Sequence, residues 1–201
     1  MTVISKPCVY FALPGKKNTD DCIACVVRRL EEGDIRIVVA ASTTGYTAGK
    51  LADALQGRGI TIVAIGESPL AKEWDAKTEY PFLKPEVKLD LERRGVIVGD
   101  KVPYLLHSSV LDYSRWQVPT PDMIVRELLY AFGQGMKVDV EVAMQAVAAG
   151  LIEPYQKVIA IGGTARGADT AVVLRATFPN HVLSQDAKKR LEIYEVLCKP
   201  L

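Results

Sequence analysis

One segment of the sequence concentrates hydroxyl groups where an apolar run gives way to a helical pattern. Residues 41–48 (ASTTGYTA) follow the apolar run IVVA. The candidate phosphate-binding residues of this segment are Ser42, Thr43, Thr44, Gly45, Tyr46 and Thr47. Free N–H groups and the positive end of a helix favour an anion, and Gly45 lets the backbone approach it closely. One hydroxyl would suffice to cap the helix, so the surplus favours phosphate binding over capping alone.

A second glycine-rich segment, residues 162–169, follows the apolar run KVIAI and is expected to lead into another helix. Its candidate ligand-binding residues are Gly162, Gly163, Thr164, Arg166, Gly167 and Asp169. The guanidinium of Arg166 presents a fork of donors that suits a phosphate or carboxylate. Asp169 would cap the expected helix or hold a ribityl or ribose hydroxyl. The alternative is a tight turn with a solvent-facing arginine, but ligands of open α/β sheets bind outside the carboxyl ends of strands.

The elements that must position these turns alternate between strand and helix. Strands are expected at residues 8–13, 35–41, 60–65, 96–98, 157–161 and 193–199, and helices at 18–32, 45–56, 85–94, 120–132, 138–149 and 167–177. A strand, a helix of about a dozen residues and another strand imply parallel pairing with right-handed crossovers. We therefore predict a single domain over residues 1–201, a doubly wound three-layer α/β sandwich. Its sheet is mostly parallel, with the tail 193–199 as an antiparallel edge strand.

Two irregular stretches, residues 66–84 and 100–119, carry aromatic residues without a regular period. Long irregular loops inside a compact domain are usually functional or mobile, so we expect both to flank one pocket. The titratable candidates beside a ligand are Glu67, His107 and Lys16, and none of them forms a recognised catalytic motif. Residues 14–18 are expected to contribute to the crevice, with Asn18 either near the ligand or capping the next helix.

Composition narrows the classes of function. The formal net charge is +1 with acids and bases interspersed, which argues against a nucleic-acid partner. No apolar run approaches the roughly 18 residues of a membrane span, and the first residues do not resemble a targeting segment. Cys22 and Cys25 form a CxxC spacing inside an expected helix, where core packing in a reducing cytoplasm is the natural interpretation. His107 and His181 lie too far apart for a metal-site motif, and self-association into a homo-oligomer stays open.

Residues 37–67, IVVAASTTGYTAGKLADALQGRGITIVAIGE, resemble the carboxyl-terminal α/β domain of pyruvate kinase. In that domain a strand ends in a Thr-x-Ser-Gly-Arg-Ser-Ala turn, which in many of these enzymes grips a phosphate of a sugar-bisphosphate effector. The residues that match the turn are Ser42, Thr44, Gly45, Thr47 and Ala48, while Tyr46 stands in place of the arginine. The catalytic barrel of pyruvate kinase has no counterpart here.

The whole chain resembles stand-alone archaeal proteins of the pyruvate kinase α/β-domain type. The resemblance implies flavin mononucleotide (FMN) as a cofactor, because FMN occupies the matching turn in that group. Two functions follow as hypotheses. One is a non-catalytic sensor or carrier that binds a phosphate-bearing small molecule, and the other is an FMN-dependent or phosphosugar-acting enzyme of unknown substrate.

Overall fold

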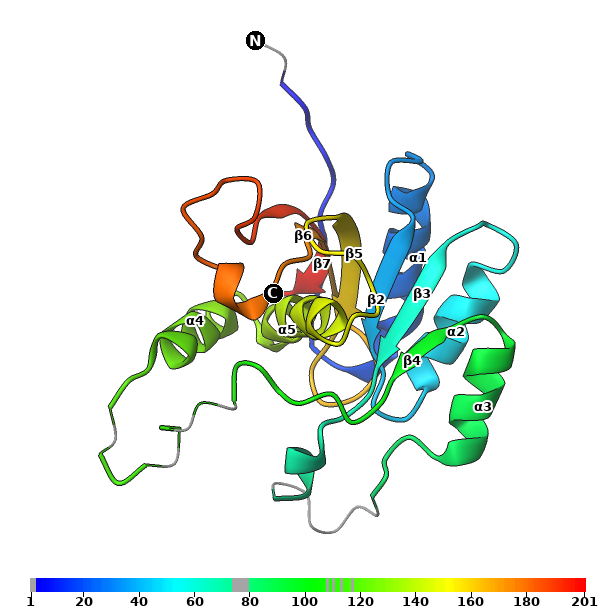
Figure 1. Ribbon diagram of the computed structural model, residues 1–201. Coiled ribbons are helices and arrows are strands. Elements are labelled where there is room, and N and C mark those ends of the chain that lie inside the picture. Colours follow the sequence, from blue (N-terminus) through cyan, green and yellow to red (C-terminus); the bar gives the residue numbers. More distant parts are fainter. Residues whose placement is uncertain (1–2, 74–79, 108, 110, 113, 117) are drawn as a thin grey trace.

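The computed structural model describes residues 3–73, 80–107, 109, 111–112, 114–116 and 118–201 (Figure 1). Its strands are β1 (Val9–Phe11), β2 (Ile37–Ala41), β3 (Thr61–Ile65), β4 (Ile97–Gly99), β5 (Lys157–Gly162), β6 (Thr170–Arg175) and β7 (Ile193–Pro200). Its α-helices are α1 (Thr19–Leu30), α2 (Tyr46–Ala54), α3 (Pro85–Arg93), α4 (Pro121–Tyr130) and α5 (Gln134–Ala148). Short 3-10 helices are η1 (Lys16–Asn18), η2 (Pro69–Glu73) and η3 (Pro179–His181).

Within the described residues, the strands form one seven-stranded sheet in the order β1-β7-β6-β5-β2-β3-β4. β2 pairs in parallel with β3 and with β5, and β3 pairs in parallel with β4. β6 runs antiparallel to both of its neighbours, β5 and β7. Because β2, β3 and β5 are parallel, their carboxyl ends meet at one edge of the sheet.

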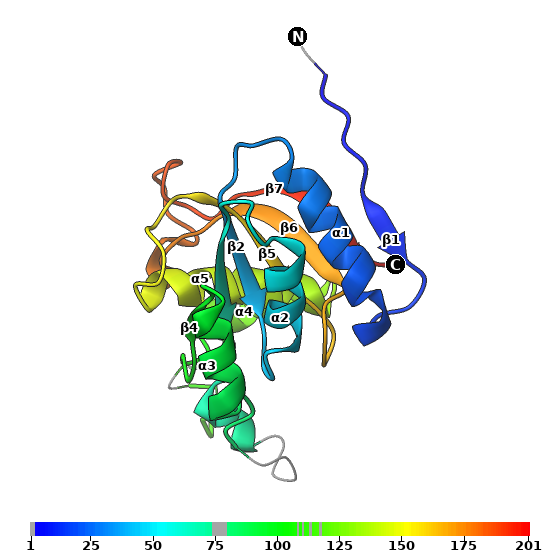
Figure 2. The same cartoon turned by 90° about the vertical axis from the view of Figure 1, so that its right-hand side faces the viewer.

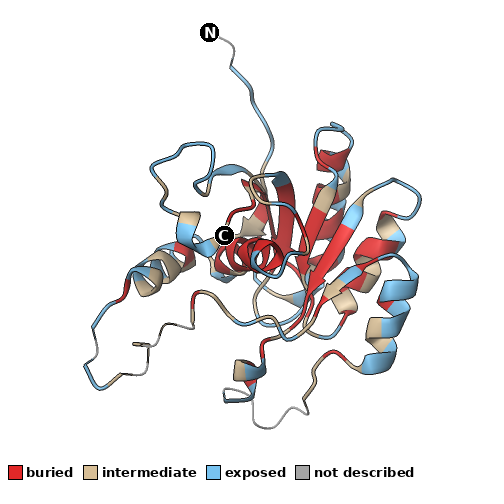
Figure 3. Ribbon diagram, in the orientation of Figure 1, coloured by how far each residue is buried: buried red, intermediate tan, exposed pale blue. Residues whose placement is uncertain are grey.

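Helices cover both faces of the sheet and create two apolar cores (Figure 2). α1, α2 and α3 pack on one face, and α4 and α5 pack on the other. The central strands and α5 are buried almost throughout (Figure 3). The continuous apolar runs of β2 and β5 follow from this arrangement, since a strand covered on both faces has no polar side. The expected α/β sandwich with a mostly parallel sheet is confirmed.

Two local predictions need correction. The helix expected at residues 167–177 is instead the strand β6, and the chain returns as a hairpin closed by the Asp169 N–H donating to the Gly162 carbonyl at 2.9 Å. The run TAVVLR is short, β-branched and fully enclosed, and periodicity alone does not separate such a strand from a helix. The tail strand β7 is antiparallel to β6 as expected, but β1 pairs on its other side, so it does not form the edge.

Among the helices of the described residues, none has the length and apolar character needed to cross a bilayer.

Candidate functional site

A cavity of about 470 Å³ opens at the carboxyl ends of β2, β3 and β5. Ten of the residues singled out in the sequence line it: Ser42, Thr43, Thr44, Tyr46, Thr47, Glu67, His107, Gly163, Arg166 and Gly167. Both irregular stretches contribute to its wall, through Glu67 from the first and Tyr104 and His107 from the second. Residues 74–79, 108, 110, 113 and 117 of these stretches lie outside the described residues.

The hydroxyl-rich turn begins α2 at one side of the cavity. Gly45 has a φ of 85°, and a side chain there would also collide with Val87 of α3. The Ser42 hydroxyl accepts a hydrogen bond from the Ala48 N–H at 3.1 Å, so Ser42 serves the helix end. The N–H groups of the first turn, those of Tyr46 and Thr47 among them, have no acceptor within the helix by geometry. This end of α2 therefore presents donors and a positive dipole to the cavity.

Glu67 lies between the turn and the loop that follows β4. The Thr43 hydroxyl donates to Glu67 Oε2 at 2.7 Å, and the Tyr104 hydroxyl donates to Oε1. Burial raises the pKa of the Glu67 carboxyl, and the hydrogen bond from Thr43 offsets that effect in part. Glu67 is thus a carboxyl group whose neutral form is favoured more than that of an exposed glutamate.

α5 sends a stripe of polar side chains into the opposite wall. Lys137, Glu141 and Gln145 are spaced four residues apart, so they share one face of the helix. The Lys137 ammonium donates to Glu141 Oε2, and both side chains are almost fully buried. Glu141 Oε1 accepts from the N–H groups of Leu105 at 3.0 Å and Leu106 at 2.8 Å. The stripe therefore holds the loop after β4 in place and fixes a cation at the cavity.

His107 is held in a neutral form. Burial lowers the pKa of its imidazole to about 4, with a further contribution from the charge of Lys137. Arg126 lies 3.0 Å from Nδ1, and because a guanidinium has only donors, Nδ1 must accept. The ring proton of neutral His107 consequently sits on Nε2, which is 3.5 Å from the Tyr130 hydroxyl.

The second glycine-rich turn, residues 162–169, leads into a strand and not into the expected helix. Because β6 is a strand, no helix end faces a ligand there. Asp169 is fully buried and accepts from the N–H groups of Gly15 at 2.7 Å and Thr164 at 3.2 Å. Its carboxylate therefore ties the hairpin to the segment before α1 instead of lining the cavity. Arg166 is exposed and lines the cavity.

Six of the candidate residues singled out in the sequence do not line the cavity: Lys16, Asn18, Gly45, Gly162, Thr164 and Asp169. The Asn18 side-chain amide donates to the Leu13 carbonyl at 2.7 Å, so it braces the turn before α1. Sequence reasoning missed the cavity-lining residues Tyr130, Gln134, Lys137, Glu141 and Gln145. Three of them, Lys137, Glu141 and Gln145, recur at i, i+4 and i+8 on α5, a spacing that indicates a shared polar face but not that the face is buried.

No family model matches the sequence. In a comparison with solved structures, the chain is similar to Cryptosporidium parvum pyruvate kinase in complex with ADP, at 17% sequence identity and a TM-score of 0.39. The similarity covers 79% of this chain and 23% of that chain. It carries no argument about what this protein binds or does.

Proposed function

We propose that the protein binds a phosphate-bearing small molecule in the cavity at the carboxyl ends of β2, β3 and β5, as a non-catalytic sensor or carrier. The observation that carries the proposal is the hydroxyl-rich N-terminus of α2 opening into this enclosed space. Thr44 and Thr47 each bring a hydroxyl group to the same wall as the first-turn N–H groups. A helix N-terminus with such donors is a ready site for an anion.

The charges around the cavity are compatible with an anionic ligand. Arg166 lines the cavity from the β5–β6 hairpin. Lys16 places its ammonium 4.1 Å from the ring centroid of Tyr46, beside the same turn. The carboxylate of Glu141 is balanced by its ion pair with Lys137, and the raised pKa of Glu67 reduces the negative charge that this residue presents. These charges, together with the positive end of the α2 dipole, favour an anion at this wall of the cavity.

FMN is the first ligand to test. Aromatic rings from three parts of the chain line the cavity: Tyr46, Tyr104 and Tyr130, together with the imidazole of His107. A cavity of about 470 Å³ falls within the range of small-molecule and cofactor sites. The resemblance of the chain to the stand-alone archaeal proteins of the pyruvate kinase α/β-domain type favours FMN, whereas the resemblance of residues 37–67 to the pyruvate kinase domain favours only a phosphate at the turn.

The test removes two hydroxyl donors without changing side-chain shape. Thr44→Val and Thr47→Val are combined, and the dissociation constants of FMN and riboflavin are measured by flavin fluorescence. Hydrogen bonds to a charged group contribute roughly 1.5–3 kcal/mol each, and about 1.4 kcal/mol is a factor of ten. We expect FMN affinity to fall by about a hundredfold or more and riboflavin affinity to change little.

A matched control is Thr61→Val, which makes the same replacement at an exposed position at the start of β3. This variant should bind both flavins as the parent protein does. Equal losses of FMN and riboflavin affinity in a well-folded double variant would show that the turn only caps α2. Competition by inorganic pyrophosphate tests how much the flavin ring contributes to binding. Displacement of FMN by a similar concentration of pyrophosphate would indicate that only the phosphate is recognised, and weak displacement would indicate recognition of the whole nucleotide.

A further inference from the structure

Four side chains that could take part in chemistry lie close together on the wall of the cavity, beginning at Glu67 next to the α2 turn. Tyr104 is central to this group, because its hydroxyl donates to Glu67. The centroid of the Tyr104 ring lies 5.9 Å from that of the His107 ring. Lys137 Nζ lies 5.7 Å from the same Tyr104 centroid. Glu67 follows β3, Tyr104 and His107 follow β4, and Lys137 belongs to α5. Three separate segments thus converge on a group that phosphate binding alone does not require.

Three members of the group, Glu67, His107 and Lys137, are suited to different parts in proton transfer. Glu67 lines the cavity and has a more basic carboxylate than an exposed glutamate, because burial disfavours its charge. His107 carries its N–H on Nε2 of an uncharged ring, 3.5 Å from the Tyr130 hydroxyl, for which a substrate oxygen would substitute. Lys137 is a cation whose position is fixed by Glu141, itself anchored by two backbone N–H groups.

A carboxylate base beside a neutral imidazole donor and an ammonium suits the removal of a proton from carbon next to a carbonyl. The base takes the proton, while positioned donors stabilise the negative charge that develops on the carbonyl oxygen. A neutral histidine is suited to this task because it polarises an oxygen without giving up its proton in the resting state. The anion-binding turn of α2 would hold the other end of such a substrate.

We propose that the cavity isomerises an open-chain sugar phosphate, an α-hydroxy aldehyde or ketone, with Glu67 as the catalytic base. The proposal rests on phosphate binding at the α2 turn, and it replaces the non-catalytic role proposed above with a catalytic one. It does not rest on FMN, whose ribityl phosphate presents the same phosphate-capped polyol chain. In this assignment Lys137 and the Nε2–H of His107 bind the carbonyl oxygen, and Glu67 faces the adjacent carbon.

The reaction balances without an oxidant or reductant. The Glu67 carboxylate forms an O–H bond with the proton of the α carbon, and the C–H electron pair becomes the C=C bond of an enediolate. The carbonyl π pair moves to oxygen, where Lys137 and His107 stabilise it. The carboxylic acid of Glu67 then returns a proton to the neighbouring carbon, while a hydroxyl proton passes between the two oxygens to complete the aldose–ketose exchange.

The test measures incorporation of solvent deuterium at the α carbon by NMR, with glyceraldehyde 3-phosphate, ribose 5-phosphate and glucose 6-phosphate as probes. Binding of the same probes is measured by calorimetry. We expect the parent protein to exchange the α proton of at least one probe and Glu67→Gln to lower that rate by about a hundredfold or more, with probe affinity retained. Glu153→Gln, at an exposed position, is the matched control and should leave the rate unchanged.

The outcomes separate this inference from the proposed function. Probe or FMN binding without exchange above the buffer rate overturns the isomerase and leaves phosphate binding intact. Exchange that persists in Glu67→Gln also overturns it, because the activity then belongs to another group or another protein. If neither FMN nor any sugar phosphate binds, both proposals fail together. Exchange that is lost in Glu67→Gln and weakened through affinity in Thr44→Val/Thr47→Val supports both.

Discussion

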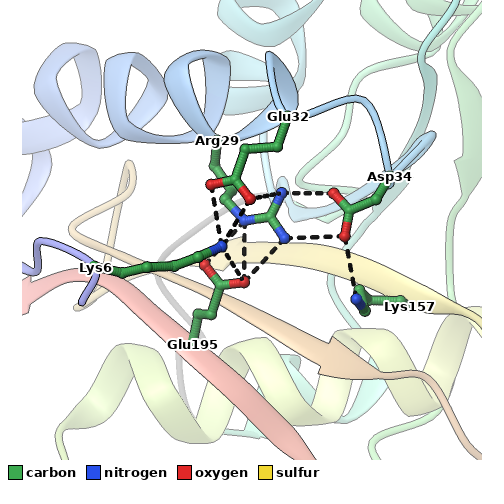
Figure 4. A network of polar contacts seen from close by, with 6 residues as sticks. All are labelled: Lys6, Arg29, Glu32, Asp34, Lys157 and Glu195. Carbon is green, nitrogen blue, oxygen red and sulfur yellow. Dashed lines mark hydrogen bonds and ion pairs between the residues drawn. The ribbon is translucent and has the colours of Figure 1, made fainter. Parts of the chain in front are cut away.

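The two ends of the sheet carry charged clusters that differ in how their charges are satisfied. At the amino end, Arg29 of α1 donates to Glu195 of β7 at 2.9 Å and to Asp34 at 2.7 Å (Figure 4). Lys6 and Lys157 complete this network through Glu195 and Asp34. At the carboxyl end, the charged and aromatic groups also bond one another, but they do so around an open cavity.

The pKa shifts at the two ends favour opposite charge states. Hydrogen bonds from Arg29 lower the pKa of Asp34, and for Glu195 the bonds from Arg29 and Lys6 outweigh the raising effect of burial. Burial instead raises the pKa of Glu67 and lowers that of His107, so both favour their uncharged forms. Paired charges with favoured ionisation are typical of a structural network, whereas groups displaced from their ordinary pKa beside a cavity are typical of a functional site.

The largest expected effect on stability is at the amino end. Arg29→Met removes a guanidinium whose side chain is 5% exposed and leaves Asp34 and Glu195 with weaker partners. The Asp34 and Glu195 side chains are 42% and 16% exposed, so water screens part of the network. We expect the free energy of unfolding to fall by about 2 kcal/mol in urea titrations, between the values for exposed and buried pairs. Affinity at the cavity should be unchanged in the folded variant.

Arg58→Met is the matched control, since Arg58 is exposed and such a surface change is expected to stay within about 0.5 kcal/mol. A loss at Arg29 no larger than the loss at Arg58 would mean that the network contributes nothing measurable. A change in cavity affinity with Arg29→Met would mean that the two ends of the sheet are coupled.

The two ends also differ in how far local sequence predicts them. The α2 turn was predictable because strand, hydroxyl-rich turn and helix are contiguous from Ile37 to Ala54. The Lys137–Glu141 pair was missed because an i,i+4 pair on a helix is ordinarily solvent-exposed. Its burial depends on the loop at Leu105 folding over α5, and no local pattern encodes that. The Arg29 network likewise joins residues up to 189 positions apart in the chain.

The prediction of a helix at residues 167–177 was wrong for a different reason. Residues Thr170–Arg175 of this segment are equally compatible with a buried helix and a buried strand. Antiparallel pairing with both β5 and β7 decides between them. That pairing depends on β7, which lies some 20 residues later in the chain.

The next largest effect on stability is expected at Asp139, a buried residue of α5. The side chain is fully buried, and among the described residues neither carboxyl oxygen has a hydrogen-bond partner. Burial raises its pKa well above the usual range, with smaller contributions from Cys198 and Asp169. A folded-state pKa above the unfolded value of about 3.9 means that the folded protein binds more protons, so stability falls as pH rises between the two values.

Asp139→Asn removes this titration. Between pH 5 and pH 7 we expect the parent to lose stability relative to the variant by up to about 1.4 kcal/mol per pH unit, measured by urea unfolding at several pH values. Below about pH 4 both proteins should lose stability together, because Asp34 and Glu195 have lowered pKa values and lose their contribution as they become protonated. If the free energies of unfolding of the two proteins changed with pH in parallel from pH 5 to pH 7, Asp139 would not titrate as its burial implies.

The smallest expected effect is at the thiols between the two ends. Cys22 and Cys25 of α1 are buried, and the Cys22 sulfur lies 3.3 Å from that of Cys198. A hydrogen bond with Cys198, together with burial, raises the pKa of Cys22, and burial raises that of Cys25 to about 11. Both are therefore protonated at neutral pH, and the thiolate is the reactive form. The expectation that they pack in the core is confirmed by their burial.

Replacing Cys22 and Cys25 together with Ala should lower the free energy of unfolding by roughly 1–2 kcal/mol through lost packing, and FMN affinity should stay the same. Cys8→Ala, at a half-buried thiol before β1, controls for the chemical change itself. Treatment of the parent protein with diamide should likewise leave affinity unaltered, because the thiolate fraction is small. A folded double variant with lost affinity, or an oxidant effect that the double variant abolishes, would instead make the α1 thiols part of the cavity's control. Residues of the core and residues at the carboxyl ends of the strands would then no longer have separate roles.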